Sequence, residues 1–168
     1  MTISIHPFTE DHWPEIWSIM KGVFRAGDSF PNAVDTTEAQ GLAYWVNPEK
    51  TIYTALNDTG QVVGAYYIKA NNIGIAAHIC NGGYMVAADA RGQGIATQLC
   101  RHSQDVARAQ GYLGMQYNLV VSTNTGAVAL WQKLGFEIVG AVPNAFRHKT
   151  LGLVDAYVMH KGLVDTSS

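Results

Sequence analysis

Apolar and polar residues follow two periods along the chain, one typical of strands and the other of helices. Short alternating or continuous apolar runs predict strands over 2–8, 51–56, 61–68, 79–88, 117–121, 136–142 and 154–161. Apolar residues at helical spacing predict helices over 11–24, from Thr36 or Thr37 to Trp45, over 95–110 and over 126–134. This order predicts a single α/β (α+β) domain spanning residues 1–168, with a mixed, mostly antiparallel sheet of about seven strands and about four helices.

Turn residues separate these elements. Asn57-Asp58-Thr59-Gly60 predicts a hairpin between two strands. Gly82 and Gly83 lie inside a predicted strand, which indicates a bulge or the close approach of a ligand. The polar segment 25–35 is expected to be a loop with Phe30 exposed in its middle. Residues 144–149, between the last two strands, are a candidate lid or dimer loop.

Composition narrows the class of protein. The chain has 168 residues, 48% hydrophobic and 14% charged, which is enough to bury a core without a disulfide or metal. Its net charge of −2 provides no basic surface for nucleic acid or anionic membranes. The start of the chain lacks a signal-peptide pattern, and no apolar run could span a bilayer, so we expect a cytoplasmic protein. Cys80 and Cys100 are expected to be reduced and partly buried, and neither cysteines nor histidines have the spacing of a metal site.

The candidate chemistry centres on Arg91-Gly92-Gln93-Gly94-Ile95-Ala96, which lies between a predicted strand and the start of a predicted helix. The first N–H groups of a helix are unpaired and carry a partial positive charge. Glycines let a ligand approach the backbone there, and an arginine adds a forked cation. The segment is therefore a candidate phosphate-binding turn. It lacks the lysine of a P-loop and the third glycine of a dinucleotide fingerprint.

With this turn after the fourth strand, the layout resembles the GCN5-related N-acetyltransferases. In that family a Q/R-x-x-G-x-G/A segment binds the pyrophosphate of acetyl-CoA, and Arg91, Gly94 and Ala96 fill its positions here. A later segment, Asn124 followed by Ala129-Leu130-Trp131-Gln132-Lys133-Leu134-Gly135-Phe136, resembles the second motif of the family. The resemblance implies acetyl-CoA as cosubstrate, a small-molecule amine as acceptor, and a possible homodimer.

Four further segments, 67–71, 78–83, 117–120 and 122–124, are similar to yeast-type acetyltransferases that detoxify L-azetidine-2-carboxylate, a proline analogue. The resemblance implies that Asn81 and Asn118 hold the acceptor and that Asn124 acts in catalysis. Each asparagine also has a structural interpretation, as a turn or capping residue, and for Asn124 the cap of the following helix. Asn118 lies inside an apolar strand, where asparagine is depleted, which favours a role in the site.

Acetyl transfer to an amine requires a neutral amine, a polarised thioester carbonyl and a thiolate that can leave. His78 is a candidate general base because histidine titrates near neutral pH, although a lone histidine is more often a hydrogen-bonded structural residue. Backbone groups of Tyr84, Met85 and Val86 are expected to pair with the pantetheine arm. An N–H of Tyr84 or Met85 is expected to polarise the thioester oxygen. Asn124 is also a candidate contact of the cosubstrate.

Trp131 stands where the family often has a tyrosine that serves as general acid, and an indole N–H cannot return a proton as a phenol can. We therefore interpret Trp131 as a core aromatic residue. Asp28 and Glu38 could attract a cationic amine, or could simply be solvated. Two alternatives to a small-molecule enzyme remain open, namely a peptide or protein N-acetyltransferase and a non-catalytic acyl-CoA-binding regulator.

Overall fold

The computed structural model describes residues 2–167. Its strands are β1 (Ser4–Pro7), β2 (Thr51–Leu56), β3 (Val62–Ala70), β4 (Ile79–Val86), β5 (Gly114–Val121), β6 (Glu137–His148) and β7 (Gly152–Gly162). Its α-helices are α1 (Trp13–Ala26), α2 (Glu38–Trp45), α3 (Ile95–Ala109) and α4 (Thr125–Lys133). None of these helices, in the part of the chain that is described, is long and apolar enough to cross a bilayer.

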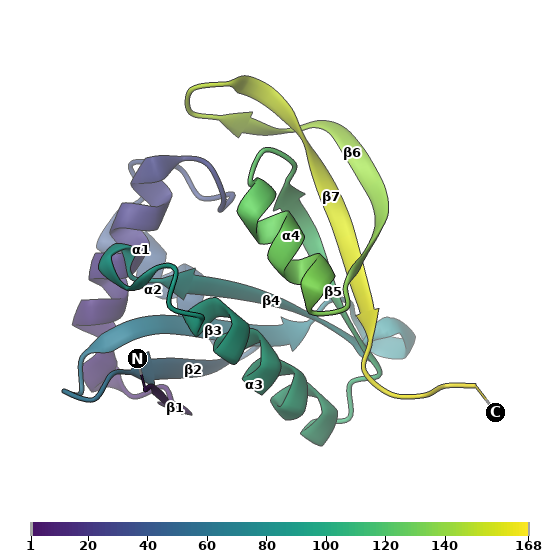
Figure 1. Ribbon diagram of the computed structural model, residues 1–168, viewed down its shortest axis with the longest axis horizontal. Helices are drawn as coiled ribbons and strands as arrows, with labels where there is room; N and C mark the ends of the chain where they lie inside the picture. Colours follow the sequence, from purple (N-terminus) through teal and green to yellow (C-terminus); the bar gives the residue numbers. More distant parts are fainter. Residues whose placement is uncertain (1, 168) are drawn as a thin grey trace.

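One sheet carries all seven strands, in the order β1-β2-β3-β4-β5-β7-β6. Every neighbouring pair is antiparallel except β4 and β5, which α3 connects as a crossover. Helices α3 and α4 lie on one side of the sheet and α1 and α2 on the other (Figure 1). The expected mixed, mostly antiparallel sheet with four helices is confirmed.

Local sequence signals fix where the helices begin and end. Thr37 caps α2, because its hydroxyl accepts from the Gln40 N–H at 3.3 Å while the Gln40 side chain accepts from the Thr37 N–H at 3.0 Å. Helix α1 carries a proline in its first turn and ends at Gly27, which is left-handed. The reciprocal bonds between Thr37 and Gln40 satisfy two backbone N–H groups that α2 cannot pair internally.

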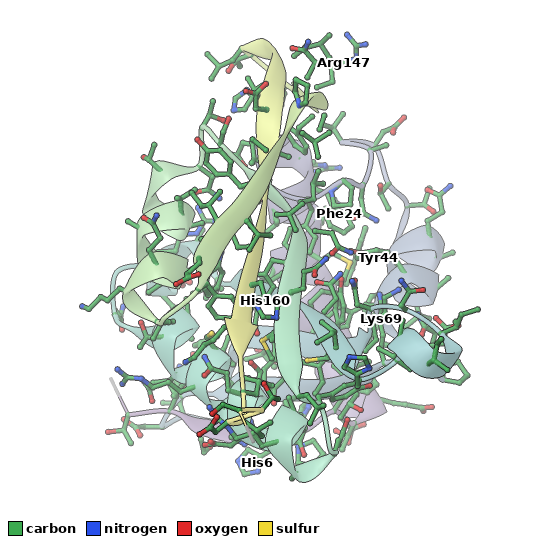
Figure 2. All side chains as sticks on the ribbon, turned by 90° about the vertical axis from the view of Figure 1, so that its right-hand side faces the viewer. His6, Phe24, Tyr44, Lys69, Arg147 and His160 are labelled. Atoms are coloured by element: carbon green, nitrogen blue, oxygen red, sulfur yellow. The ribbon has the colours of Figure 1, made fainter. Side chains whose placement is uncertain are left out.

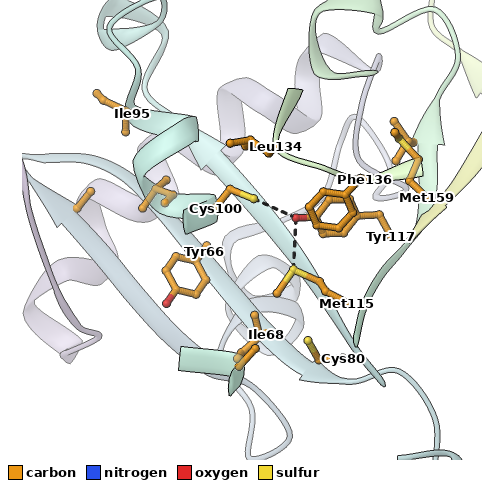
Figure 3. Packing of buried hydrophobic residues seen from close by; sticks show 14 of the residues in the cluster. Tyr66, Ile68, Cys80, Ile95, Cys100, Met115, Tyr117, Leu134, Phe136 and Met159 are labelled. Carbon is orange, nitrogen blue, oxygen red and sulfur yellow. Dashed lines mark hydrogen bonds between the residues drawn. The ribbon is translucent and has the colours of Figure 1, made fainter. Parts of the chain in front are cut away.

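Two hydrophobic cores lie on the two faces of the sheet. On one face, Ile16 and Met20 of α1 and Trp45 of α2 pack against β3, and all three side chains are fully buried. On the other face, α3 packs over β3 and β4. The same core extends to β5, where Tyr117 donates to the sulfur of Met115 at 3.5 Å (Figure 3). Residues 62–68 of β3 are buried without interruption because helices cover both faces of the sheet there.

Three local expectations were wrong. Phe30 is half-buried, not exposed, because its ring packs against Phe24 and Trp45 at centroid distances of 5.8 and 6.4 Å. Residues 144–148 are not a loop, because β6 continues to His148 and pairs with β7 through Phe146 and Val154. A register shift between Val142 and Phe146 absorbs the irregular segment without ending the strand. Cys80 and Cys100 are fully buried, not partly buried.

The bulge expected at Gly82 and Gly83 is also absent, since β3 and β4 stay in register from Gly64–Val86 to Ala70–Cys80. The glycine is needed for close packing instead. A Cβ at Gly83 would lie 2.7 Å from the ring of Tyr67, which faces it across the strand pair. The ring of Tyr67 therefore occupies the space above Gly83.

We expect the fold to be lost steeply at alkaline pH. Burial raises the pKa of Tyr66, Tyr67 and Tyr117 above the usual value, and each side chain is at most 6% exposed. Above pH 10 the unfolded chain releases these protons while the folded chain retains them, so stability falls as pH rises. Each such tyrosine lowers the free energy of unfolding by about 1.4 kcal/mol per pH unit between its unfolded and its folded pKa. A titration monitored by circular dichroism and tyrosinate absorbance should show both signals changing together; gradual ionisation of all tyrosines in a folded protein would contradict this.

Candidate active site

The segment between β4 and α3 forms a turn with open space at its glycines. Gly92 and Gly94 have φ values of +76° and +78°, and a Cβ at either position would meet nothing within 4 Å. Gly94 is the N-cap residue of α3 and has no side chain to bond the first N–H groups of the helix. The turn lines one end of a cavity of about 1110 Å³. The predicted phosphate-binding turn thus has the geometry that an anion requires.

The individual residues of the turn contribute differently. Arg91 is exposed and lines the cavity, and Ala96 also lines it. The side chain of Ile95 is 2% exposed and packs in the core, so only its backbone is available to a ligand. Gln93 is exposed and is not among the lining residues. Of Gln93, therefore, only the backbone could contact the cosubstrate.

Beyond the turn, the cavity follows a fork between β4 and β5. The two strands pair only at Ile79–Gly114 and Cys80–Met115 and then diverge. Tyr84, Met85 and Val86 line the fork. The Tyr84 hydroxyl is already bonded to Ser103 at 2.7 Å, and Met85 is buried on the opposite face. Their backbone groups on the β5 side are thus the ones that a ligand in the fork can reach.

Asn81 and Asn118 both line the cavity, on neighbouring strands beside the fork. The side-chain oxygen of Asn81 accepts from the Gly82 N–H at 2.7 Å. Asn118 donates to Asn71 at 2.7 Å and accepts from Gln116 at 3.0 Å. The structure therefore places both asparagines on one cavity, and it orients Asn118 through Asn71 and Gln116, which do not line that cavity themselves.

Asn124 satisfies both interpretations of its sequence position. It is the N-cap of α4, and its side-chain oxygen accepts from the Ala127 N–H at 3.4 Å. It also lines the cavity at the α4 side of the fork. Its Nδ2 group has no hydrogen-bond partner within residues 2–167, which leaves a donor available to a ligand.

His78 lies apart from these residues. It is exposed, precedes β4 and does not line the cavity, and its carbonyl accepts from the Leu113 N–H at 2.8 Å. The structure therefore gives its imidazole no route to the fork. We expect His78→Ala to leave the turnover number within about twofold of wild type, as for most surface substitutions; a loss in steady-state assays of more than tenfold would restore the general-base hypothesis.

Trp131 packs as a core aromatic residue at the edge of the cavity. Its ring lies 5.2 Å from that of Tyr84 and 5.1 Å from that of Tyr117, centroid to centroid. It also lines the cavity, where it forms an apolar wall. This packing is the role that the sequence indicated.

A group of residues at the far end of the cavity was missed by sequence reasoning. Lys50 lies over the rings of both Tyr44 and Tyr67, 3.9 Å from each centroid, and its ammonium donates to the Tyr44 carbonyl. Burial, reinforced by Lys69, lowers the pKa of Lys50 to about 8. Tyr44, Lys50, Tyr67 and Lys69 all line the cavity (Figure 2 labels Tyr44 and Lys69). They lie on α2, in the segment before β2, and on β3, so no local sequence motif predicts that they share a site.

The two acidic candidates separate. Asp28 is exposed and lines the cavity, whereas Glu38 accepts from the Trp13 indole at 3.1 Å and does not line it. The loop that carries Asp28 is held against the β6–β7 hairpin, because the Lys149 N–H donates to the Gly27 carbonyl at 3.0 Å. His148, at the end of β6, also lines the cavity.

Comparisons with known proteins agree on one family. The model of the acetyltransferase (GNAT) family matches residues 13–136. N-acetyltransferase aca1 of Schizosaccharomyces pombe is 39% identical over 98 residues, which cover 58% of this chain and 47% of aca1. This chain thus spans less than half the length of that relative.

Solved structures agree with the same assignment. A GCN5-related N-acetyltransferase from Kribbella flavida superposes with a TM-score of 0.90 at 35% identity, covering 95% of this chain and 97% of that one. A phosphinothricin acetyltransferase from Sinorhizobium meliloti, solved in complex with AcCoA, superposes with a TM-score of 0.85 at 20% identity over 96% of this chain and 89% of that one. The second likeness concerns the fold alone.

Proposed function

The chain belongs to the acetyltransferase (GNAT) family, whose cosubstrate is acetyl-CoA, and on that premise we propose that it acetylates the amine of a small molecule, an amino acid or a proline-like analogue. The single observation that carries the proposal is the continuity of the cavity. It extends from the glycine turn at Arg91–Gly94, through the β4–β5 fork, to the asparagines on the other side. A phosphate-bearing thioester can lie along this path with its acyl end at the fork.

The residues divide the proposed chemistry among them. The N–H groups of the turn, with Arg91, hold the pyrophosphate. A backbone N–H of Tyr84 or Met85 stabilises the charge that develops on the thioester oxygen. Asn81 and Asn118 hold the acceptor, and Asn124 donates from Nδ2 to the reacting thioester. The neutral amine attacks the carbonyl carbon, so that the C–N bond forms as the C–S bond breaks and CoA leaves as its thiolate. The nitrogen, cationic after the attack, gives its proton to water, and water protonates the thiolate.

The burial of both cysteines favours direct transfer of the acetyl group to the amine over a route through an acyl-enzyme. A covalent route would need a reactive thiolate beside the thioester. Cys80 and Cys100 are both fully buried and neither lines the cavity. Burial also raises the pKa of Cys80 to about 12, which keeps it a neutral thiol at physiological pH.

The proposal is tested by release of free CoA thiol from acetyl-CoA in the presence of single acceptors. The panel contains the proteinogenic amino acids and cyclic secondary amines such as azetidine-2-carboxylate. We expect acceptor-dependent release with one or a few small amino acids. Release with a peptide but with no free amino acid would favour the peptide N-acetyltransferase, and tight acetyl-CoA binding without any release would favour the non-catalytic regulator.

Three further properties belong to the same proposal. Detoxification is the role that fits an acceptor resembling a proline analogue. The cytoplasm fits two unpaired cysteines, since disulfides are rare there. A homodimer fits the edge strand β6, where Ile138 and Val139 are 39% and 59% exposed. Sedimentation equilibrium would test the last of these, and a monomer at all concentrations would contradict it.

A further inference from the structure

The cations that line the cavity outnumber its carboxylates. Lys50, Lys69 and Arg91 line it, whereas Asp28 is the one carboxylate in the lining of the described chain. Arg91 belongs to the turn that receives the pyrophosphate. Lys50 and Lys69 lie elsewhere, on the side of the sheet that α1 and α2 cover, together with Tyr44 and Tyr67. Two positive charges therefore remain at the acceptor end after the cosubstrate has been accommodated.

These two charges form no ion pair with any of residues 2–167. The ion pair found among residues 2–167 joins Arg108 and Asp105, and neither lines the cavity. Lys50 is instead held by the faces of two aromatic rings and by a backbone carbonyl, and the neighbouring Glu49 offsets only part of the lowering of its pKa by burial and Lys69. Partly buried cations without a counter-ion are costly, and a ligand that supplies the missing negative charge recovers that cost.

The position of Lys69 links these charges to the reaction centre. Lys69 is paired with Asn81 in the register of β3 and β4, and Asn81 in turn neighbours the fork. Asn118 follows on the next strand. The cationic group and the two asparagines thus border one chamber, in which a single small molecule can contact both.

We propose that Lys50 and Lys69 bind the carboxylate of the acceptor. The substrate class is then an amino acid with a free carboxylate, and not an amine that lacks one. This inference rests on the proposed acetyltransferase function and specifies its acceptor. A lysine-rich peptide would be repelled by the same two charges. Burial and Lys69 lower the pKa of Lys50 to about 8, a value at which the ammonium is still charged at pH 7.

The test compares each amino acid with its own primary amide as acceptor. Azetidine-2-carboxylate, L-proline and glycine are paired with their carboxamides, at saturating acetyl-CoA. For each pair the ratio of kcat/KM for acid and amide is measured in wild type, Lys69→Gln and Lys69→Arg. Dividing the ratio of the variant by that of wild type cancels the different basicity of the two amines. Lys133→Gln, an exposed lysine outside the cavity, is the matched control.

We expect wild type to prefer the acid, and Lys69→Gln to reduce that preference about tenfold, mainly through KM for the acid, as for loss of a charge-assisted contact. Lys69→Arg should retain most of the preference, and Lys133→Gln all of it. The KM for acetyl-CoA should not change in any variant. If Lys69→Gln does not fold, Lys50→Gln takes its place in the same comparison with wild type, and an unchanged ratio in that variant contradicts the cationic site.

Failure of this inference differs from failure of the proposed function. Acetylation of acid and amide with an unchanged ratio in Lys69→Gln would overturn the carboxylate site and leave the acetyltransferase intact. Binding of acetyl-CoA with no transfer to either member of any pair would overturn both. Transfer to lysine peptides in preference to free amino acids would replace the anionic acceptor by a cationic one.

Discussion

Gly94→Val should weaken acetyl-CoA binding about a hundredfold. Gly94 has a φ of +78°, a conformation that a β-branched residue adopts only under strain. Relief of that strain turns the N–H groups at the start of α3 away from the anion. Loss of two charge-assisted hydrogen bonds of about 1.5 kcal/mol each corresponds to this change in affinity. Calorimetric titration of the variant with acetyl-CoA measures it directly.

Gly60→Val is the matched control, because it separates strain from binding. Gly60 has a φ of +81° in the hairpin between β2 and β3, and, as at Gly94, a Cβ there would meet nothing within 4 Å. Both variants should therefore lose a similar free energy of unfolding, roughly 1–3 kcal/mol. Only Gly94→Val should lose affinity. Equal affinity in the two variants would show that the turn does not hold the cosubstrate.

The turn could be predicted from the sequence because six consecutive residues carry it. A strand, two glycines and a helix start define both its conformation and its ligand chemistry. The hairpin at 57–60 is equally local, since its four turn residues are contiguous. Features encoded by contiguous residues are those that a single sequence reveals.

The acceptor end could not be predicted in this way. Lys50 precedes β2, Tyr44 lies on α2, and Lys69 is the penultimate residue of β3, so only tertiary packing places them around one chamber. His78 shows the opposite error: it is next to a strand of the site in the sequence, yet lies outside the cavity. Proximity along the chain predicts a shared site only when the intervening backbone turns toward it.

Phe30 illustrates the same limit for packing. Its polar neighbours indicate a solvated loop, but the ring fills space between Phe24 and Trp45. Full burial of such a side chain contributes about 1.5–3 kcal/mol, so even half-burial of Phe30 offsets the preference of the surrounding residues for solvent. The loop that carries Asp28 and Ser29 into the cavity is thus anchored by a residue whose own role is structural.

Asn124→Asp should lower kcat about a hundredfold while leaving the fold intact. Aspartate matches asparagine in shape and remains a good N-cap, so the contact with the Ala127 N–H is retained. It lacks the Nδ2 donor, and its charge opposes the negative charge that develops on the thioester. Removal of one such donor costs about 3 kcal/mol in the transition state. The measurements are kcat at saturating acetyl-CoA and the midpoint of thermal unfolding.

Two further substitutions at Asn124 separate the cap from the chemistry. Asn124→Ser retains a neutral cap, so it should remain as stable as wild type, while its shorter side chain withdraws the donor and lowers kcat. Asn124→Ala removes both groups, and should lose about 1 kcal/mol of stability in addition to activity. If Asn124→Asp and Asn124→Ser keep the turnover of wild type and only Asn124→Ala is impaired, the residue acts solely by capping α4. The donor to the thioester would then have to come from the backbone of the fork alone.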